Sequence, residues 1–258
     1  MPRSGFEVQR ATIKALFLRE MRTRFGKYQL GYFWALLEPA AHMLMMIVIF
    51  GYLMNRAMPD ISYPIFLING IIPYFLFSSI SNRSINAIEA NKGLFNYRPV
   101  KPIDTIISRS VLETLIAIAV YIFLTLFVVF MGENVWIDNF IILCSSWFFL
   151  ILLSVGLGLI FMVVGAKYPE TEKFLPILIK PFYFISCVMF PLHTIPKDYW
   201  SYILWNPIVH AIELSRNAIV PGYESDAVNL YYLALCSILV LFIGLALYRT
   251  QEEKMLTS

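Results

Sequence analysis

The sequence predicts an all-α polytopic membrane protein with six transmembrane helices, and three observations support this. The 258 residues are 59% hydrophobic and only 14% charged, whereas about a quarter of a typical soluble domain is charged. Six apolar stretches approach or exceed the roughly 20 residues that a helix needs to cross about 30 Å of hydrocarbon. The lysines and arginines gather in a few of the gaps between these stretches. We therefore expect one transmembrane domain that covers residues 1–258.

The expected spans, in chain order, are 32–54, 62–81, 105–131, 136–164, 173–189 and 227–248. Sixteen of the twenty Lys and Arg residues fall on the side of the membrane that holds the N-terminus, three fall on the other side, and Lys180 lies inside the fifth span. Short loops rich in Lys and Arg stay on the cytoplasmic side. We therefore expect both termini in the cytoplasm.

The N-terminal segment holds seven of the basic residues within its first 27 positions. It lacks the apolar core and cleavage site of a secretory signal, so we expect it to remain in the mature protein. Within residues 8–25, apolar side chains recur at helical spacing, which predicts an amphipathic helix lying on the inner membrane surface. They are Ile13, Leu16, Phe17 and Met21. A helix that docks only on a partner protein is the alternative.

The connection between the second and third spans reads NRSINAIEANKGLFNYRPVKPID. Residues 84–92 suit a short helix, Gly93 suits its end, and Pro99 and Pro102 prevent its continuation. We expect Asp104 to cap the third span through its carboxylate. The connection is either a solvated loop or a docking element, since it offers the apolar anchors Leu94, Phe95 and Tyr97 beside polar residues.

The segment between the fifth and sixth spans is broken by proline, since half of the fourteen prolines fall between Pro169 and Pro221. We expect residues 190–222 to form short re-entrant or interface helices on the outer side, where protein or water can satisfy the interrupted backbone. If residues 202–220 crossed instead, Arg249 and Lys254 would lie outside, against the charge rule.

Charged and aromatic residues inside the spans are candidates for a substrate path, because an isolated charge in lipid costs several kcal/mol. Glu113 and Lys180 each lie about 13 Å from the cytoplasmic end of their spans, so they could face one polar interior and pair. Glu38 and His42, one turn apart, form a second candidate. In both cases, separately solvated groups are the alternative. The expected path residues are Trp34, Glu38, Glu113, Lys180, Phe182 and Tyr183.

Aromatic residues make up 16% of the chain and form three clusters. One lies at the start of the first span, one lies in the fifth span, and one lies in the outer segment around Tyr199, Trp200, Tyr202 and Trp205. Tyr and Trp are enriched at membrane interfaces, which explains much of this content. Stacking on the faces of sugar rings is the second interpretation.

Several kinds of chemistry have no motif in this sequence. The phosphate-binding loop G-x-x-x-x-G-K-[ST], the metal pair H-E-x-x-H and the nucleophile elbow G-x-S-x-G do not occur. The three histidines are scattered, and Cys144, Cys187 and Cys236 show no paired spacing. We therefore expect a chain that is not an enzyme, with no metal site, no cofactor of its own and no nucleic acid partner.

Three segments resemble the KpsM family, the inner-membrane permeases of capsular polysaccharide ATP-binding-cassette exporters. They are ALFLREMRTRFGKYQLGYFWALLEP, IEANKGLFNYRPVKPIDTI and CVMFPLHTIPKDYWSYILWNPIVHAIELSR. The resemblance covers essentially the whole chain. It implies a homodimer of six-span subunits, re-entrant helices before the last span, and a separate ATPase subunit on each protomer that binds MgATP. A periplasmic adaptor and an outer-membrane export protein are further partners that it implies.

The resemblance also implies two sites. The family's ATPase-contacting coupling helix corresponds to residues 84–97, with the expected contacts Glu89, Asn91, Lys92, Gly93, Leu94, Phe95 and Tyr97. Its outer gate corresponds to residues 191–216, with Tyr199, Trp200, Trp205, Glu213 and Arg216. The implied cargo is a capsular polysaccharide attached to a lipid. A hydrated polymer cannot enter hydrocarbon, so it needs an enclosed polar route, which two copies could line along a two-fold axis.

Two alternatives remain. A permease of the same fold could move another cargo, such as an O-antigen, a teichoic-acid-type polymer, a lipid or a drug. A membrane enzyme acting on lipid-linked sugars would need a clustered acid/base or metal set, and the sequence shows none.

Overall fold

The computed structural model of the chain describes residues 4–26, 31, 33–53, 62–95, 100–220, 222–223 and 226–257. These residues form helices joined by turns, and no strand occurs among them. The elements are α1 (Gly5–Phe25), α2 (Phe33–Met46) with the π-helical η1 (Ile47–Leu53), α3 (Tyr63–Ile85), the 3-10 helix η2 (Glu89–Leu94), α4 (Pro102–Phe130), α5 (Phe140–Lys167), α6 (Thr171–Ile185), the 3-10 helices η3 (Leu192–Thr194) and η4 (Lys197–Tyr202), α7 (Pro207–Ile219) and α8 (Leu230–Thr257).

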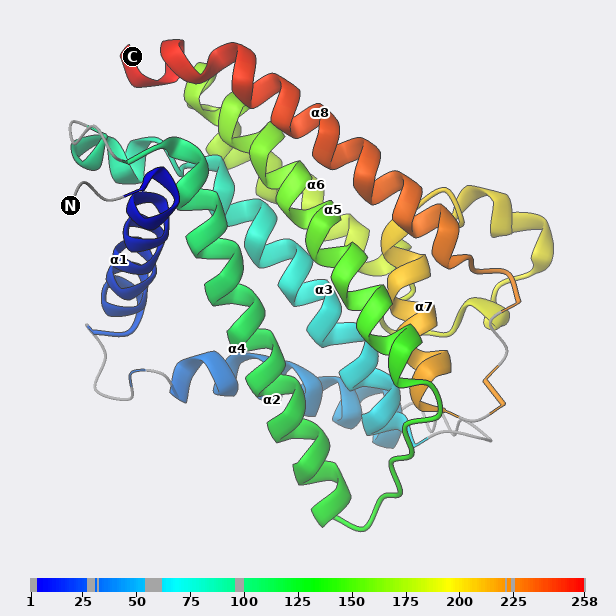
Figure 1. The fold of residues 1–258 in the computed structure, drawn as a ribbon. Coiled ribbons are helices and arrows are strands. Elements are labelled where there is room, and N and C mark those ends of the chain that lie inside the picture. Colours follow the sequence, from blue (N-terminus) through cyan, green and yellow to red (C-terminus); the bar gives the residue numbers. More distant parts are fainter. Residues whose placement is uncertain are drawn as a thin grey trace.

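Helix α3 is the centre of the bundle. It packs against α4 and α5, and α5 packs in turn against α8 (Figure 1). In the apolar window of α3, 78% of the residues are buried inside the chain, compared with 17% for α2 and for α8. The central helix therefore makes most of the core, while the outer helices present apolar surface to their surroundings.

Close contact between α5 and α8 depends on two glycines. A Cβ atom on Gly156 would lie 2.6 Å from the backbone nitrogen of Leu241, and one on Gly244 would lie 2.5 Å from the carbonyl oxygen of Gly156. Small residues let membrane helices approach closely enough for extensive van der Waals contact. The two backbones therefore touch where a larger residue would separate them.

Five helices are long and apolar enough to cross a membrane among the described residues, namely those containing 33–50, 63–85, 102–130, 140–167 and 230–255. They correspond to the expected spans one to four and six. The ends of the first expected span, Tyr32 and Met54, lie outside the described residues. Helix α6, the expected fifth span, has only 15 residues and contains Pro176 and Pro181. It covers about 22 Å, which is less than the hydrocarbon thickness.

The third expected span begins three residues earlier than predicted, at Pro102, because proline is already restricted to the dihedral angle of a first helical position. The Asp104 carboxylate still caps this helix, but from inside its first turn, where it accepts a hydrogen bond from the Lys101 N–H at 3.0 Å. Helix α1 likewise begins earlier than predicted. The Ser4 hydroxyl accepts from the Glu7 N–H, and the Glu7 carboxylate accepts from the Ser4 N–H.

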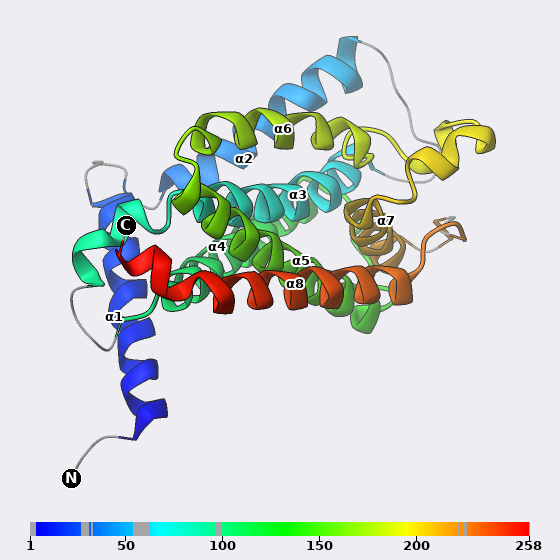
Figure 2. The same ribbon diagram turned by 90° about the horizontal axis from the view of Figure 1, so that it is seen from above.

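The apolar stripe of α1 faces α4. Leu16 is buried, and Ile13, Phe17 and Met21 are half-buried. Figure 2 shows α1 running across the end of the bundle that also holds the C-terminal turns of α8. The apolar side chains of α1 therefore pack against another helix of the same chain.

The connection after α3 differs from the predicted helix 84–92. Helix α3 continues to Ile85, and the buried Ser84 hydroxyl donates to the Ile80 carbonyl within it at 2.7 Å. A turn follows, and η2 then extends to Leu94, so Gly93 lies inside this helix instead of ending it. Residues 96–99, which include Tyr97, lie outside the described part of the chain.

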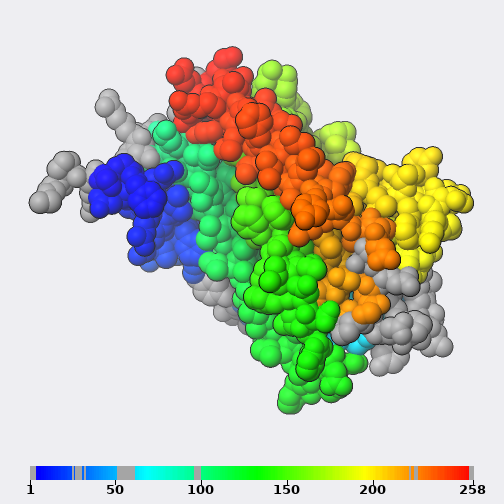
Figure 3. Space-filling model, turned by 45° about the vertical axis from the view of Figure 1, so that its right-hand side comes forward, coloured from blue at the N-terminus to red at the C-terminus, as the bar shows by residue number. Residues whose placement is uncertain are grey.

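The segment 190–219 consists of η3, η4 and the longer α7. It lies at the end of the bundle opposite α1 and the C-terminal turns of α8 (Figures 1 and 2). Helix α7 is almost entirely buried against α3, α5 and α8. Figure 3 shows α4, α5 and α8 forming a continuous face between these two ends. Its exposed apolar side chains include Leu126, Phe127, Phe130, Leu239 and Phe242.

Candidate functional site

The 3-10 helix η2 is held in place by α1. Asn91 is buried, its amide nitrogen donates to the Ala87 carbonyl at 2.8 Å, and its amide oxygen accepts from the Arg19 guanidinium. Arg19 also donates to the Ala90 carbonyl. Asn91, predicted as a docking contact, therefore faces the protein instead. A push on η2 would be transmitted directly to α1.

The remaining predicted docking residues differ in exposure. Glu89, Lys92 and Gly93 are exposed, whereas Leu94 and Phe95 are half-buried. Phe95 packs against a core cluster that contains Ile88, Ile106, Met162 and Met255. A groove of about 570 Å³ lies beside η2, lined by Glu89, Lys92 and Phe95 together with residues from α5, α6 and α8. This end of the molecule thus offers a recess with mixed charge, suited to a protein partner.

A buried carboxylate joins three helices at the same end. Glu113 of α4 is 5% exposed and binds both the Arg24 guanidinium of α1 and the Arg83 guanidinium of α3, the latter at 2.9 Å. Arg109 pairs with Glu20 of α1 at 2.8 Å and also donates to the Arg83 carbonyl. Two arginines share one carboxylate at Glu113, so the cluster keeps a net positive charge.

The predicted pair of Glu113 and Lys180 is wrong for the described chain. Lys180 lies on the exposed face of α6 and makes no ion pair with the residues that the structure describes. The prediction used only the depth of each residue along its span. It did not include the direction in which each side chain points. In the sequence, Arg24 interrupts the apolar stripe of α1. A charge at such a position indicates a buried group of opposite charge, which is Glu113.

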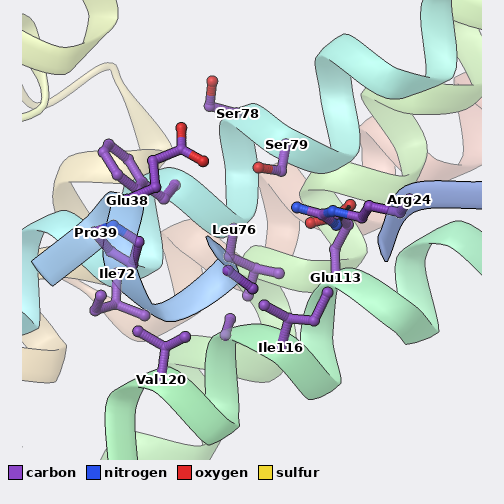
Figure 4. Close-up of a pocket in the computed structure, with 13 residues that line it drawn as sticks. Arg24, Glu38, Pro39, Ile72, Leu76, Ser78, Ser79, Glu113, Ile116 and Val120 are labelled. Carbon is purple, nitrogen blue, oxygen red and sulfur yellow. Dashed lines mark hydrogen bonds and ion pairs between the residues drawn. The ribbon is translucent and has the colours of Figure 1, made fainter. Parts of the chain in front are cut away.

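Glu38 and Glu113 line one cavity of about 180 Å³ between α1, α2, α3 and α4. Figure 4 shows the Arg24 and Glu113 pair on one side of this cavity and Glu38 on the other, with Ser79 between them in this view. Glu38 is exposed. Ser78 and Ser79 of α3 also line the cavity. The cavity therefore offers charged and hydroxyl groups to a polar ligand.

Helices α2, α3 and α6 meet in an aromatic cluster. A hydrogen bond of 2.8 Å joins the His42 imidazole and the Tyr183 hydroxyl, and the Tyr74 hydroxyl donates to the Ile179 carbonyl at 2.6 Å. The Tyr74 and Tyr183 rings are 5.1 Å apart, edge to face. The structure thus brings His42 to Tyr183, on another helix, as its hydrogen-bond partner.

The other predicted path residues lie apart from this cluster. Phe182 contacts the Trp205 ring, whereas Trp34 and Lys180 are exposed on α2 and α6. The structure therefore groups Glu38 with Glu113, and Phe182 with Trp205. It does not assemble all six predicted residues into one site.

A buried ion pair fixes the outer segment. Arg216 is fully buried, binds Glu213 at 2.6 Å, and donates to the carbonyls of Cys187 and Val188 at 2.8 and 2.7 Å. Its guanidinium carbon lies 3.6 Å from the centroid of the Phe66 ring on α3. Arg216 therefore ties α7 to α3 and to the turn that ends α6, where Cys187 adopts a left-handed conformation with φ 56°.

Tyr223 completes this cluster, because its hydroxyl donates to the second Glu213 oxygen at 2.7 Å. Burial raises the pKa of Tyr223, and the Glu213 carboxylate raises it further, so the hydroxyl remains a donor at neutral pH. The other predicted gate residues are less buried than Glu213 and Arg216. Tyr199 and Trp205 are exposed, and the half-buried Trp200 donates to the Ile195 carbonyl at 2.8 Å.

Metal coordination has no candidate in the part of the chain that the structure describes, since no three His, Cys, Asp or Glu side chains gather there. The arrangement instead offers a recess for a partner at one end, a polar cavity between helices, and a rigid buried cluster at the other end.

Comparisons with known proteins show the family of this chain. The family model described as ABC-2 type transporter matches residues 11–220. The polysialic acid transport protein KpsM of Escherichia coli is 67% identical over the full length of both chains. The capsule polysaccharide export inner-membrane protein CtrC of Neisseria meningitidis is 28% identical over 93% of this chain and 90% of its own length. The O-antigen export system permease RfbA of Myxococcus xanthus is 23% identical over 96% of this chain and 95% of its own. The chain belongs to the ABC-2 type transporter family.

Proposed function

We propose that this chain is the membrane subunit of an ATP-binding-cassette exporter that moves an acidic capsular polysaccharide, attached to a lipid, out of the bacterial cytoplasm. The observation that carries the proposal is the 67% identity, without terminal gaps, to a polysialic acid transport protein. The family is one of transporters, so this chain is a permease and not an enzyme.

Six crossings complete the proposed subunit, a single domain over residues 1–258. We assign residues 173–189, which comprise most of α6 and the turn after it, to the fifth crossing, because α6 alone covers only about 22 Å. Segment 190–222 then re-enters from the periplasmic side, supported by the nearly complete burial of α7. Cation counts favour cytoplasmic placement of α1, η2 and both termini. Two such subunits form a homodimer, because six helices alone enclose little space for a polymer.

Energy comes from two copies of a separate ATPase subunit, which bind MgATP and dock on η2. Exposed Glu89, Lys92 and Gly93 and half-buried Leu94 and Phe95 support this placement, since they lie on η2 or at its end, beside the groove. Tyr97, the remaining predicted contact, lies outside the described residues. Movement of η2 passes through the Asn91 and Arg19 contact to α1, and through the Glu113 cluster to α3 and α4.

The proposed polysaccharide path runs along the two-fold axis between the exposed faces of α2 and α6. Trp34, Lys180, Phe182 and Tyr183 contribute to it. The exposed ring of Trp34 and the half-buried ring of Phe182 can stack on sugar rings without a fixed register. Tyr199, Trp200 and Trp205 form the outer gate, and the Glu213 and Arg216 pair anchors it. A periplasmic adaptor and an outer-membrane export protein receive the polymer.

Replacement of Leu94 by aspartate tests this proposal in a strain whose own permease gene is deleted. Surface polysaccharide should fall at least about tenfold, and the ATPase should no longer co-purify, because a charge replaces an apolar anchor worth about 2 kcal/mol. The matched control is Gly5→Asp, which adds the same charge where a Cβ atom would have nothing within 4 Å. Normal export by a Leu94→Asp permease that inserts at the wild-type level would contradict docking on η2.

The cargo is tested by chemical analysis of the polymer that accumulates in the cytoplasm of the deletion strain. An acidic capsular polymer carrying a lipid is expected. An O-antigen, the cargo named for the 23% identical relative, would replace the capsular assignment. Docking and cargo are thus decided by separate measurements.

A further inference from the structure

A second cavity adjoins the polar one and has the opposite character. It has a volume of about 430 Å³ and lies between α1, α2 and α4. Its lining is apolar and includes Phe17 and Met21 of α1, Leu36 of α2, and Leu115 and Phe123 of α4. Three residues, Ala35, Ile116 and Val120, line both cavities, so the two are continuous along α2 and α4.

The apolar groove has the length of one membrane leaflet. It extends along α4 from Leu112 to Phe123, eleven helical steps that rise about 16 Å. Half of the hydrocarbon thickness of a bilayer is about 15 Å. The polar cavity runs beside the groove from Glu113 to Val120, and its charged groups Glu113 and Arg24 lie next to the Leu112 end. An extended acyl chain would therefore fill the groove with its headgroup at the depth of Glu113 and Arg24.

Charges in the polar cavity match a zwitterionic headgroup. Arg24, Arg83 and the Glu113 carboxylate that they share carry one net positive charge, which attracts a phosphate. Glu38 faces the other side of the cavity, is exposed, and makes no hydrogen bond or ion pair with any described residue. A primary ammonium would supply this carboxylate with both charge and N–H donors. Ser78 and Ser79 can bind the phosphate or glycerol oxygens between them.

We propose that this pair of cavities binds one phospholipid of the inner leaflet, with an ethanolamine headgroup, on each chain. The phosphate lies beside Arg24, the ammonium beside Glu38, and one acyl chain along α4 beneath Phe17 and Met21. The lipid would pin α1 against α2 and α4 where the helices themselves leave a gap. This inference requires insertion in a membrane but not the export of a polysaccharide.

Native mass spectrometry of the full-length permease tests the proposal. The protein is prepared from a strain that makes no capsular polymer and is exchanged into bilayers with equal amounts of phosphatidylethanolamine and phosphatidylglycerol. Wild type should retain one phospholipid per chain, with about a fivefold preference for ethanolamine, the size expected for one partly solvated ion pair. Glu38→Gln should retain a lipid but lose the preference.

The groove is tested separately by filling it. Ala119 is exposed on α4 and lines the groove, so Ala119→Trp should abolish lipid retention without a clash inside the core. Ala246→Trp is the matched control, since Ala246 is exposed on α8. It should retain the lipid as wild type does.

Four outcomes would overturn the proposal. The first is retention by Ala119→Trp equal to that of wild type, which would mean annular lipid only. The second is the absence of a headgroup preference in wild type. In the third, lipid is bound only in cells that make the polymer, which would mean that the groove holds the anchor of the cargo. In the fourth, a disulfide forms between two Ala119→Cys chains, which would mean that a second copy covers the groove.

Discussion

Arg216 shows how a charge can be stable in the interior of this protein. Its guanidinium is fully buried, and two carbonyls, the Glu213 carboxylate and the Phe66 ring surround it. Gly70 makes room for it, since a Cβ atom there would lie 2.6 Å from the Arg216 Nη2. Breaking a buried pair by removing one partner leaves an uncompensated charge, whereas removing both does not.

We therefore predict that Arg216→Met destabilises the protein by about 3–5 kcal/mol, because Glu213 would remain buried without its partner. The double variant Arg216→Met/Glu213→Leu should recover part of that loss. Apparent melting temperature in detergent measures both, and Lys197→Met, at an exposed cation, serves as the control. A double variant no more stable than Arg216→Met would show that the polar contacts to Cys187 and Val188 matter more than the ion pair.

His210 on α7, outside the five candidate spans, makes the outer segment sensitive to acid. Nδ1 accepts from the Asn229 N–H at 2.9 Å, so Nε2 carries the proton and donates to the Leu204 carbonyl at 2.8 Å. Burial lowers the pKa of His210, and the bond to Leu204 opposes this only in part. The folded chain therefore binds a proton less readily than the unfolded chain.

The stability contributed by neutral His210 should thus be complete above the ordinary pKa of about 6.5 and decrease as the pH falls below it. We predict that the melting temperature of wild type falls between pH 7.5 and pH 5.5, and that it falls less for His210→Gln. Equal pH dependence of the two proteins would assign the effect to other groups.

At the scale of elements, the helices are shaped by where their backbones must approach. Helices α5 and α8 meet at Gly156 and Gly244, and α5 meets the end of α3 at Gly165. A Cβ atom on Gly165 would lie only 2.1 Å from the Ile85 carbonyl oxygen. Apolar periodicity cannot reveal such contacts, because both helices are apolar on most sides.

Alanine substitutions distinguish packing from helix propensity. Alanine favours a helix over glycine by up to about 1 kcal/mol, so Gly5→Ala, with nothing within 4 Å, should be neutral or slightly stabilising. Gly156→Ala should instead destabilise by about 1–3 kcal/mol, because the new methyl group meets the backbone of α8. Thermal unfolding of the two variants measures the difference. A stabilised Gly156→Ala would show that α5 and α8 can separate without loss.

At the scale of the whole molecule, the two ends of the bundle have different compositions. One end holds α1, η2, the C-terminal turns of α8 and the arginine clusters, and the other holds η3, η4 and α7 (Figures 1 and 2). This separation matches the proposed cytoplasmic and periplasmic sides. The recess beside η2 and the buried Arg216 cluster therefore lie at opposite ends of the bundle.

Introduced cysteines test this orientation in a variant whose exposed Cys144 and half-buried Cys236 are replaced by serine and whose buried Cys187 is kept. A membrane-impermeant maleimide added to intact spheroplasts should label Asp198→Cys, which is exposed on η4. It should label Glu253→Cys on α8 only after the membrane is permeabilised. Labelling of both in intact spheroplasts would place the last helix in the opposite direction and remove the six-span topology.

The sequence by itself determined the class of the protein and the place of most helices. Spans of 20 or more apolar residues are specified by composition alone, because the backbone in hydrocarbon must satisfy its own hydrogen bonds. It also indicated the family through three motif segments. Predictions about single residues succeeded only where local geometry sufficed, as for the cap at Asp104.

Only the tertiary structure decided which side chains meet. Glu113 binds Arg24 and Arg83 instead of Lys180, Asn91 faces Arg19, and two cavities join between α1, α2 and α4. The physical reason is that depth along a span follows from residue number, whereas the facing direction depends on how each helix is rotated and crossed against its neighbours. Those rotations are set by close contacts such as Gly156 against Leu241, which involve residues distant in the sequence.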